Sequence, residues 1–436
     1  MALRAAKSAA GFAVVPSPVF WHELEVTCLK VEPTIRSPAR FGAQARGEGM
    51  RRLLMVTNLF PDQDEPWRGL DNATVLEAMR QQRPQVDVRV LALRPRPWPA
   101  LGPALALRPR LADQELRPIY ARCPYLPWLG GLNDVLLERG LRRARQLLPE
   151  GWQPDALLVP WLFPDACGAA LHRAWRHLPL VAVAQGSDVH RYLQWPMRRR
   201  AILALSRRAQ IISRSEELRQ RLIAAGAQPN AVITVHNGVD RRCFRPGDSL
   251  VERQSLGLPQ ESALVLFVGN FLPVKGLDLL LESFALARRS VPGAQLALIG
   301  GGPLESALRS RAQALGLVDQ VRWLGRLGPA EISQWMRAAH LLCLSSHHEG
   351  LPNVILEALS CGCPVLSTDV GGIREVIGPS SVQGRLVAGR DSGHYAQAML
   401  YLLALGRRGA LDSASEIGDW HDCAGKYWRV LENGLV

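Results

Sequence analysis

The sequence predicts two α/β domains, each a doubly wound parallel sheet covered by helices. Short apolar runs of β type alternate with helical patterns from about residue 50 to the end of the chain. These runs are apolar on both faces, as is typical of parallel strands that helices cover on either side. The length of 436 residues agrees with two or three domains of about 150 residues each.

The first domain is expected to contain six of these strands and the second domain five. Those of the first domain are Leu53–Thr57, Val86–Leu93, Ala156–Pro160, Leu180–Ala184, Ile211–Ile212 and Val232–Val235. Those of the second domain are Leu264–Gly269, Gln295–Gly300, Val321–Leu324, Leu341–Leu344 and Pro364–Thr368.

Breaks in the periodic pattern indicate the domain boundaries. Residues 1–49 have no sustained period and carry scattered Pro and Gly, so we predict a poorly ordered N-terminal extension. The first domain then covers 50–245 and the second 246–415, because the Arg-Pro-Gly-Asp stretch at 245–248 interrupts both periods.

A last helix is predicted within residues 416–436. Trp420, Tyr427, Trp428 and Leu431 recur there at spacings close to one helical period. We interpret this aromatic stripe as a packing face and expect the helix to pack back on the first domain.

The composition is that of a globular protein, with 47% hydrophobic and 21% charged residues. Arg or Pro interrupts the Leu-rich stretches before they reach about 18 residues, so no transmembrane helix is expected. The eight cysteines show no C-x-x-C spacing and no neighbouring His cluster. This argues against a disulfide framework and a structural zinc site and favours a reducing, cytoplasmic compartment.

The excess positive charge lies in the first part of the chain. Residues 1–250 hold 36 basic and 22 acidic side chains, whereas residues 251–436 hold 16 and 17. Two interpretations stay open, a solvated Arg-rich surface and attraction to anionic lipid at the inner face of the membrane. Nucleic acid is not an expected partner, because the sequence has neither an aromatic stacking platform nor a known reading motif. The clusters are Arg142, Arg143, Arg145, Arg198, Arg199, Arg200, Arg207 and Arg208.

The strongest chemical signal is a pair of glutamates around a predicted helix start. Pro352 suits the first helical turn and Gly362 suits the position after the last, so we expect about nine helical residues directly behind Glu349. Glu357 then lies within the helix. The open N–H groups of Gly350, Leu351 and Asn353 would form an anion site that fits a diphosphate.

Carboxylates on either side of a diphosphate site suit a nucleotide sugar, which presents a sugar and a ribose to them. Two isolated glutamates eight positions apart are more often surface residues. Here the apolar strand Leu341–Leu344 precedes Glu349, and ligands of open α/β sheets bind beyond the carboxyl ends of strands. A donor site is therefore the favoured interpretation.

With its E-x7-E spacing followed by Gly362-Cys363-Pro364, this segment resembles the retaining glycosyltransferases of family 4. The resemblance covers roughly Met50 to Leu435 and implies a GT-B fold, in which two Rossmann-like domains face a central cleft. Residues 267–276 resemble the phosphate-binding loop of the family, with Asn270 where the family commonly has Arg. Lys275 should then carry most of the charge contact.

The resemblance also assigns roles to individual residues. Catalytic roles fall on Glu349, Lys275 and Asp188. The donor-binding residues that it implies are Gly269, Asn270, Lys275, Gly301, Trp323, Gly350, Leu351, Pro352 and Glu357. The acceptor-side residues are Asn58, Gly69, Gln185, Gly186 and Ser187.

Two details of the first domain bear on mechanism. Gln185 stands where the family usually has His, and Gln cannot relay a proton. Asp62-Gln63-Asp64 has the D-x-D form of a metal site, but GT-B enzymes offset diphosphate charge with a helix end and protein cations. No metal and no cofactor other than the nucleotide-sugar co-substrate is expected.

The function implied is retaining transfer of a hexose from a nucleotide-diphosphate donor to a glycan or lipid-linked acceptor. Polysaccharide hexosyltransferases of the teichuronic-acid type, which also tend to lack the His before Gly-Ser-Asp, are the most similar members. The expected setting is cell-envelope biosynthesis at the inner face of the cytoplasmic membrane. A nucleotide-sugar epimerase and a non-catalytic nucleotide-sugar-binding protein are the alternatives, and no residue distinguishes UDP from GDP.

Overall fold

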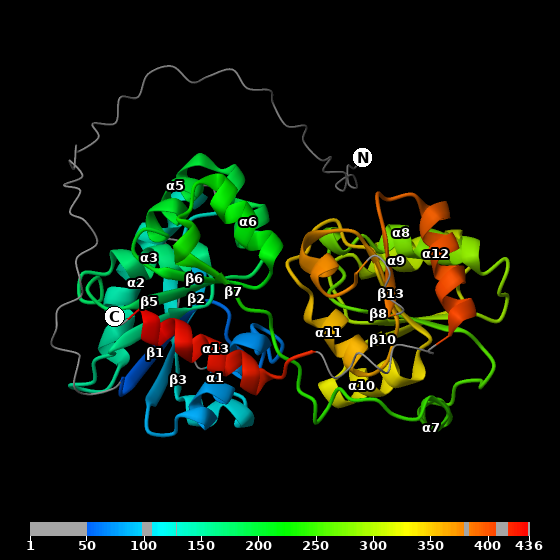
Figure 1. Cartoon of the computed structure of the whole chain (residues 1–436), viewed down its shortest axis with the longest axis horizontal. Helices are drawn as coiled ribbons and strands as arrows, with labels where there is room; N and C mark the ends of the chain where they lie inside the picture. Colours follow the sequence, from blue (N-terminus) through cyan, green and yellow to red (C-terminus); the bar gives the residue numbers. More distant parts are fainter. Residues whose placement is uncertain (1–49, 98–106, 128, 379–382, 407–416, 435–436) are drawn as a thin grey trace, which may run out of the picture. The chain divides into compact units, whose positions relative to one another are not determined.

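The protein contains two all-parallel α/β sheets, as the sequence predicts (Figure 1). The computed structural model describes residues 50–97, 107–127, 129–378, 383–406 and 417–434. The expected N-terminal extension, residues 1–49, lies outside the described residues. We call the first sheet with its helices the first lobe, and the second sheet with its helices the second lobe.

The sheet of the first lobe has seven strands in the order β3-β2-β1-β4-β5-β6-β7. They are β1 (Arg52–Thr57), β2 (Asp87–Pro97), β3 (Pro118–Tyr125), β4 (Ala156–Val159), β5 (Leu180–Ala184), β6 (Gln210–Ser213) and β7 (Val232–Thr234). The helices between them are α1 (Leu70–Gln82), α2 (Asn133–Ala144), α3 (Cys167–Leu171), α4 (Ser187–His190), α5 (Pro196–Leu205) and α6 (Glu216–Ala225).

The sheet of the second lobe has six strands in the order β10-β9-β8-β11-β12-β13. They are β8 (Leu264–Val268), β9 (Gln295–Ile299), β10 (Val321–Gly325), β11 (Leu341–Leu344), β12 (Val365–Thr368) and β13 (Gly384–Val387). The helices are α7 (Ser249–Ser255), α8 (Leu277–Ala287), α9 (Glu305–Ala314), α10 (Pro329–Ala338), α11 (Asn353–Ser360) and α12 (Ser392–Leu405), and α13 (Trp420–Asn433) follows.

All eleven expected strands are present, but the prediction missed β3 and β13. Both are edge strands. Half-buried β3 carries polar and Pro residues, and β13 is only four residues long. Neither strand has a mainly apolar run of the kind by which the other eleven strands were recognised.

Alternation along β1 explains why helices cover both faces of its sheet. Leu54 and Val56 are fully buried in one apolar cluster, whereas Leu53 and Met55 are fully buried in a second cluster on the opposite face. Successive side chains of a strand point to opposite faces. A strand that buries every residue therefore needs a layer of helices on each side.

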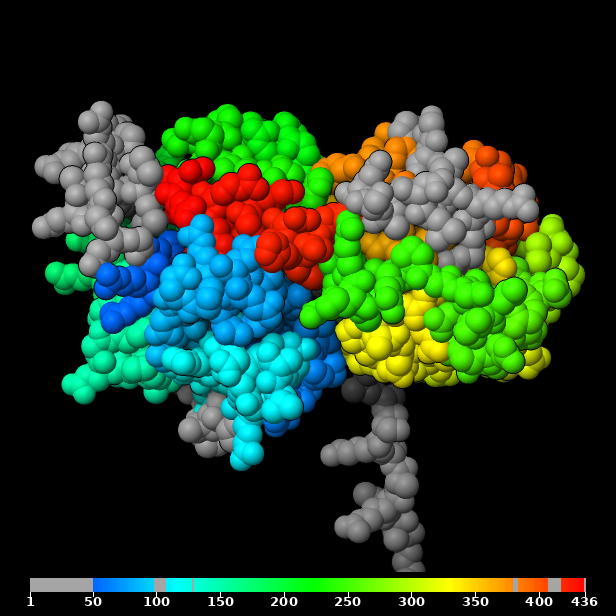
Figure 2. Space-filling model, turned by 60° about the horizontal axis from the view of Figure 1, so that its bottom comes forward, coloured from blue at the N-terminus to red at the C-terminus, as the bar shows by residue number. Residues whose placement is uncertain are grey.

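Helix α13 packs on α1 of the first lobe (Figures 1 and 2). The indole Nε1 of buried Trp428 donates to the carbonyl oxygen of Met79 at 3.1 Å, and Arg83 forms an ion pair with Glu432. Tyr427 and Trp428 join the same apolar cluster as Met79. The aromatic stripe of this helix is thus a packing face.

Within the described residues, no helix combines the length and the apolar character needed to cross a bilayer. The parallel strands of each sheet all end at the same edge. The loops that leave these carboxyl ends carry nearly every residue singled out in the sequence, which brings the candidate site together.

Candidate functional site

Lys275 and Glu349 form an ion pair in the second lobe, with the ammonium Nζ 2.5 Å from Oε1 of Glu349. The hydroxyl of Ser346 donates to the same oxygen at 2.6 Å. Lys275 lies in the loop after β8, and Ser346 and Glu349 lie in the loop after β11, the neighbouring strand. Among the described residues, Oε2 of Glu349 has no hydrogen-bond partner and is available to a ligand.

Two glycines allow the loops after β8 and β12 to approach the loop after β11. A Cβ at Gly276 would overlap the carbonyl oxygen of Ser345, and one at Gly371 would overlap that of Glu349. Both glycines have positive φ angles, of 56° and 62°, which favour Gly over other residues. The Lys-Gly and Gly-Gly pairs of the sequence therefore meet a packing need beside Glu349.

Helix α11 begins later than predicted. It starts at Asn353, and Pro352 is its N-cap with an extended ψ of 125° instead of a residue of the first turn. Gly350 and Leu351 consequently belong to the loop. The N–H groups of Gly350, Leu351 and Asn353 donate to no described residue, so the expected set of open donors is present at the helix end.

Glu357 lies on α11 with its carboxyl group surrounded by protein. Burial raises its pKa to about 7. No hydrogen-bond partner of this carboxyl group is found among the described residues, although the residue as a whole keeps some surface exposure. A desolvated carboxyl without a partner is costly, and a hydroxyl donor from a ligand would satisfy it.

Three glycine-rich turns lie side by side at the ends of β8, β9 and β10. The amide of Gly269 donates to Ile299 at 2.9 Å, and the amide of Gly300 donates to Gly325 at 2.7 Å. Gly301 and exposed Asn270 lie on two of these turns. The predicted donor residues 269, 270 and 301 are therefore neighbours.

Trp323, on β10, is a half-buried ring between two neighbours. It meets Phe271 edge to face, with centroids 5.9 Å apart. The guanidinium of Arg309 lies over the ring, 4.5 Å from its centroid. These contacts fix the ring at the strand end, beside the glycine turns.

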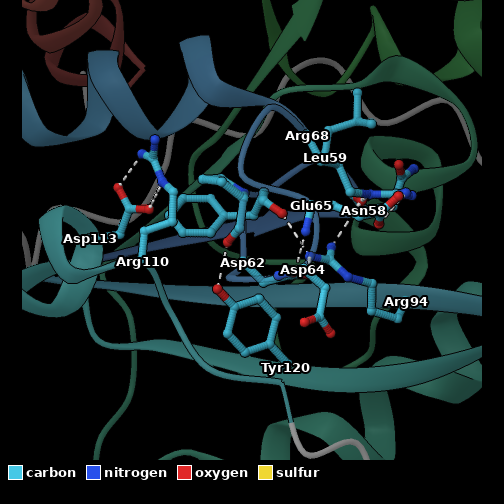
Figure 3. Close-up of polar contacts among 12 residues, drawn as sticks. Asn58, Leu59, Asp62, Asp64, Glu65, Arg68, Arg94, Arg110, Asp113 and Tyr120 are labelled. Carbon is cyan, nitrogen blue, oxygen red and sulfur yellow. Dashed lines mark hydrogen bonds and ion pairs between the residues drawn. The ribbon is translucent and has the colours of Figure 1, made fainter. Parts of the chain in front are cut away.

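The loop after β1 is built around a buried ion pair (Figure 3). Arg94 Nη2 lies 2.5 Å from Oδ2 of Asp62, and the two side chains are only 7% and 1% exposed. The other oxygen of Asp62 accepts from the amides of Asp64 and Glu65. Desolvation raises the pKa of Asp62, but these hydrogen bonds outweigh it and lower the pKa overall. The D-x-D motif is thus a loop anchor whose first carboxylate is already occupied.

Asn58 and Gly69 stand at the two ends of this loop. The amide and side-chain nitrogens of Asn58 donate to Asp165 at 2.7 and 2.8 Å. Asp165 is fully buried, and desolvation raises its pKa to about 7 despite these bonds. Gly69, with a φ of 60°, precedes α1 at a point where a Cβ would overlap Leu59.

The carboxylate of Asp188 organises the loop after β5. It accepts from the backbone amides of Leu162, Gln185 and Gly186 at 2.8 to 3.3 Å. The group is fully buried, and desolvation raises its pKa despite those bonds. This geometry gives Asp188 a positioning contact, and its predicted catalytic role remains a prediction. Ser187 begins the short helix α4.

Gln185 uses both amide hydrogens within the protein. Its Nε2 donates to Oδ1 of Asn72 at 2.9 Å and to the carbonyl of Pro160 at 2.6 Å. These two hydrogen bonds fix the orientation of the Gln185 side chain, with its nitrogen facing Asn72 and Pro160.

The loops after β5 and β11 meet. Nε2 of His190, in α4, lies 2.8 Å from the carbonyl oxygen of Glu349, and a Cβ on Gly186 would be 3.4 Å from the amide of Gly350. The structure thus brings residues predicted for the acceptor side and residues predicted for the donor side together. His190 is a residue that the sequence interpretation did not include.

A buried polar network is a further feature that sequence reasoning missed. Arg214 donates to Oδ1 of Asn72 at 3.2 Å, forms an ion pair with Asp71 at 3.1 Å and bonds Asn237. Asn237 in turn donates to Oδ1 of Asn353 at 2.5 Å, at the start of α11. Their positions in the sequence could have indicated these residues. Arg214 comes directly after β6, and Asn237 comes three positions after β7, at the strand ends where ligands of such sheets bind.

One described group could offer three metal ligands, with the atoms of Asp419, His421 and Asp422 within 4.8 Å of one another. Asp419 and Asp422 accept each other's backbone amides at the start of α13. This reciprocal capping accounts for both carboxylates.

Comparison with known proteins supplies the family context. Residues 68–242 match the family described as "Glycosyltransferase Family 4", and residues 248–415 match "Glycosyl transferases group 1". A D-inositol 3-phosphate glycosyltransferase 2 of Catenulispora acidiphila is 34% identical over 258 residues, 56% of this chain and 60% of that protein. A D-inositol 3-phosphate glycosyltransferase of Frankia alni is 36% identical over 52% of this chain and 57% of its own. The chain thus spans less than two thirds of these curated relatives.

Solved structures share the fold. Anabaena HepE in complex with UDP and glucose superposes with a TM-score of 0.65 at 20% identity, over 88% of this chain and 99% of that one. The sucrose-phosphate synthase of Thermosynechococcus elongatus gives a TM-score of 0.70 at 17% identity, over 88% and 99%.

Proposed function

Because the chain belongs to glycosyltransferase family 4 and has the GT-B fold, we propose that it transfers a hexose from a nucleotide-diphosphate donor. The acceptor is a glycan or lipid-linked sugar of cell-envelope polysaccharide, and the configuration of the sugar is retained. The curated relatives are named for an inositol phosphate acceptor, which supports a polyhydroxylated acceptor. UDP and glucose in the related HepE structure support a UDP-sugar as the first donor to test.

The observation that carries this proposal is the set of groups around the start of α11. Oε1 of Glu349 is held by Lys275 and Ser346, which leaves its second oxygen for a sugar hydroxyl. Eight residues on, the desolvated carboxyl of Glu357 lacks a partner among the described residues, and a ribose hydroxyl would supply one. The open amides between them suit the diphosphate.

The chemistry proposed is a front-face displacement. The bond from the sugar C1 to the diphosphate oxygen breaks, the bond from C1 to the acceptor oxygen forms on the same face, and the acceptor proton passes to the leaving diphosphate. Negative charge develops on the leaving group, and Lys275 with the amides near Leu351 stabilises it there. Lys275 and these amides offset the negative charge of the leaving diphosphate, and we propose that the reaction uses no metal and no further cofactor.

In this proposal the first lobe positions the acceptor and does not transfer a proton. Gln185 is held as a donor to Asn72 and Pro160 and cannot act as a base. Asp188 holds the amides of the same loop in place. With Asn58 fixed by Asp165, these loops form a preorganised acceptor side.

We also propose that the first lobe contacts anionic lipid at the inner face of the cytoplasmic membrane. An apolar patch supports this, formed by side chains 42–59% exposed: Leu129, Leu132, Val135, Trp195 and Met197. A Cβ on Gly131 would touch Met197 Sδ at 2.9 Å, so the two parts of the patch adjoin. Beside it, Arg199, Arg200 and Arg207 line a surface groove. Apolar side chains with basic neighbours are typical of interfacial binding.

Flotation with phosphatidylglycerol vesicles tests the lipid contact. Co-flotation that weakens with salt is expected, and Trp195→Ser with Met197→Ser should reduce it. Val318→Ser, an exposed apolar residue of the second lobe at 64% exposure, is the matched control. Binding unchanged by the double substitution would overturn this assignment.

The donor proposal is tested by incubating the protein with UDP- and GDP-sugars and extracted lipid-linked acceptors. A donor at 100 times its dissociation constant should add about 2.7 kcal/mol of stability, and a glycosylated acceptor with retained configuration should form. Glu357→Ala should mainly raise KM, whereas Glu349→Ala should also lower kcat. An epimerised donor without transfer, or no conversion of any donor, would contradict the proposal.

A further inference from the structure

A cationic side chain lies over the joint between two glycine turns of the second lobe. The turns after β8 and β9 interlock, since the amide of Phe271 donates to Gly301 at 3.0 Å. A Cβ on Gly300 would overlap the carbonyl of Gly269. Arg326 follows directly after β10, whose last residue is Gly325.

Two contacts hold the guanidinium of Arg326 there. Its Nη1 donates to Oδ1 of Asn270 at 3.1 Å. Its Cζ lies 4.3 Å from the ring centroid of Trp67, which is 48% exposed. Its Nε would be 3.8 Å from a Cβ on Gly301. An amide oxygen and an aromatic face orient a guanidinium without neutralising its charge.

The charge of Arg326 differs from that of its neighbours in having no carboxylate counterpart. Lys275 pairs with Glu349, and Arg309 pairs with Glu305. Arg390 lies 3.4 Å from Asp278. In the described ranges no ion pair includes Arg326, although Oε2 of Glu305 would lie 3.8 Å from the same Cβ on Gly301 as Nε of Arg326 does.

We propose that Arg326, together with Lys275, binds the diphosphate of the donor, and that Asn270 orients its guanidinium. The inference rests on the proposed function and extends it. Arg326, directly after β10, would thus supply the second cation, and Asn270 on the turn after β8 would hold it in place. The planar fork of a guanidinium suits two phosphate oxygens.

Titration calorimetry with UDP, UMP, uridine and their guanosine counterparts tests this. Arg326→Gln should weaken binding of the nucleoside diphosphate about tenfold, the effect of losing one charge-assisted hydrogen bond. Binding of the nucleoside should stay unchanged. Adding Asn270→Arg to Arg326→Gln should restore most of the lost affinity. Arg311→Gln is the matched control, since Arg311 is exposed and pairs with Glu282.

The outcomes separate this inference from the proposed function. Wild-type protein that binds a nucleoside diphosphate as tightly as Arg326→Gln does overturns only the role of Arg326. If Arg326→Gln loses the same affinity for the nucleoside as for the nucleoside diphosphate, the proposed phosphate contact is overturned, because such a result indicates contact with the base. Wild-type protein that binds no nucleoside diphosphate overturns both.

Discussion

Lys275 and Glu349 lie 74 positions apart in the sequence, and yet the ammonium of one is 2.5 Å from the carboxylate of the other. Their side chains are 21% and 11% exposed. The cation expected to meet the diphosphate is thus held by the carboxylate expected to meet the sugar. Each residue positions the other, so substituting one affects both.

Lys275→Ala should lower kcat/KM by about 100-fold, because loss of a preorganised charge-stabilising donor costs about 3 kcal/mol in the transition state. Initial-rate kinetics with the identified donor measure this. Lys426→Ala removes an exposed lysine of α13 and serves as the control. Wild-type turnover by Lys275→Ala would contradict the assigned role.

Glu357→Gln should stabilise the ligand-free protein at high pH. Burial raises the pKa of Glu357 from 4.5 to about 7, so the folded state holds a proton that the unfolded state has lost. The contribution of this residue to stability is full below pH 4.5 and is lost as the pH rises through 7.

The substitution should therefore raise the free energy of unfolding by about 1–3 kcal/mol at pH 8 and leave it unchanged at pH 4. Urea unfolding at both pH values measures the difference. The same variant should bind donor less tightly, since the ribose loses an acceptor. Glu150→Gln, at an exposed residue of the first lobe, is the control. A Glu357→Gln protein that is less stable at pH 8 would refute this account.

Gln185→Glu should destabilise the protein more than Gln185→Ala. A carboxylate there would face the oxygens of Asn72 and Pro160, which now accept from the amide. Loss of these half-buried donor contacts, with two acceptors then facing a carboxylate, costs about 2 kcal/mol. Gln260→Glu breaks an exposed bond to Leu250 and should cost less than about 0.5 kcal/mol. Equal midpoints of denaturant unfolding for both Gln→Glu variants would count against the fixed geometry of Gln185.

Arg94→Ala should cost about 3–5 kcal/mol, because it leaves the buried carboxylate of Asp62 without its cation. Arg242 and Asp240 form an exposed pair, at 91% and 37% exposure, and Arg242→Ala should cost at most about 1 kcal/mol. Denaturant unfolding measures both.

The pH dependence of the Arg94–Asp62 pair has the opposite sign to that of Glu357. The pKa of Asp62 is lowered in the folded state, so its contribution is present above its ordinary pKa of 3.8 and is lost as the pH falls through the folded value. The destabilisation of Asp62→Asn relative to wild type should therefore shrink under strongly acidic conditions. A difference that stays constant down to such pH would show that the ion pair does not titrate.

The sequence predicted the central strands and the loops that carry the site, because buried parallel strands must be apolar on both faces. It predicted Glu349 from the local pattern of strand, loop and helix start, and it predicted Lys275 and the glycine turns from the family resemblance. The edge strands β3 and β13 and the late start of α11 escaped it, since partial burial and the backbone angles at Pro352 leave no distinct pattern.

By itself, then, the sequence determined the parallel α/β architecture and the order of the site segments, which depend on hydrophobic periodicity and local turn chemistry. Only the tertiary structure decided which side chains pair: Lys275 with Glu349, Asp62 with Arg94, and Arg326 with Asn270. The paired residues are 32 to 74 positions apart in the sequence. Their distances depend on strand order and loop packing, which no local stretch of sequence encodes.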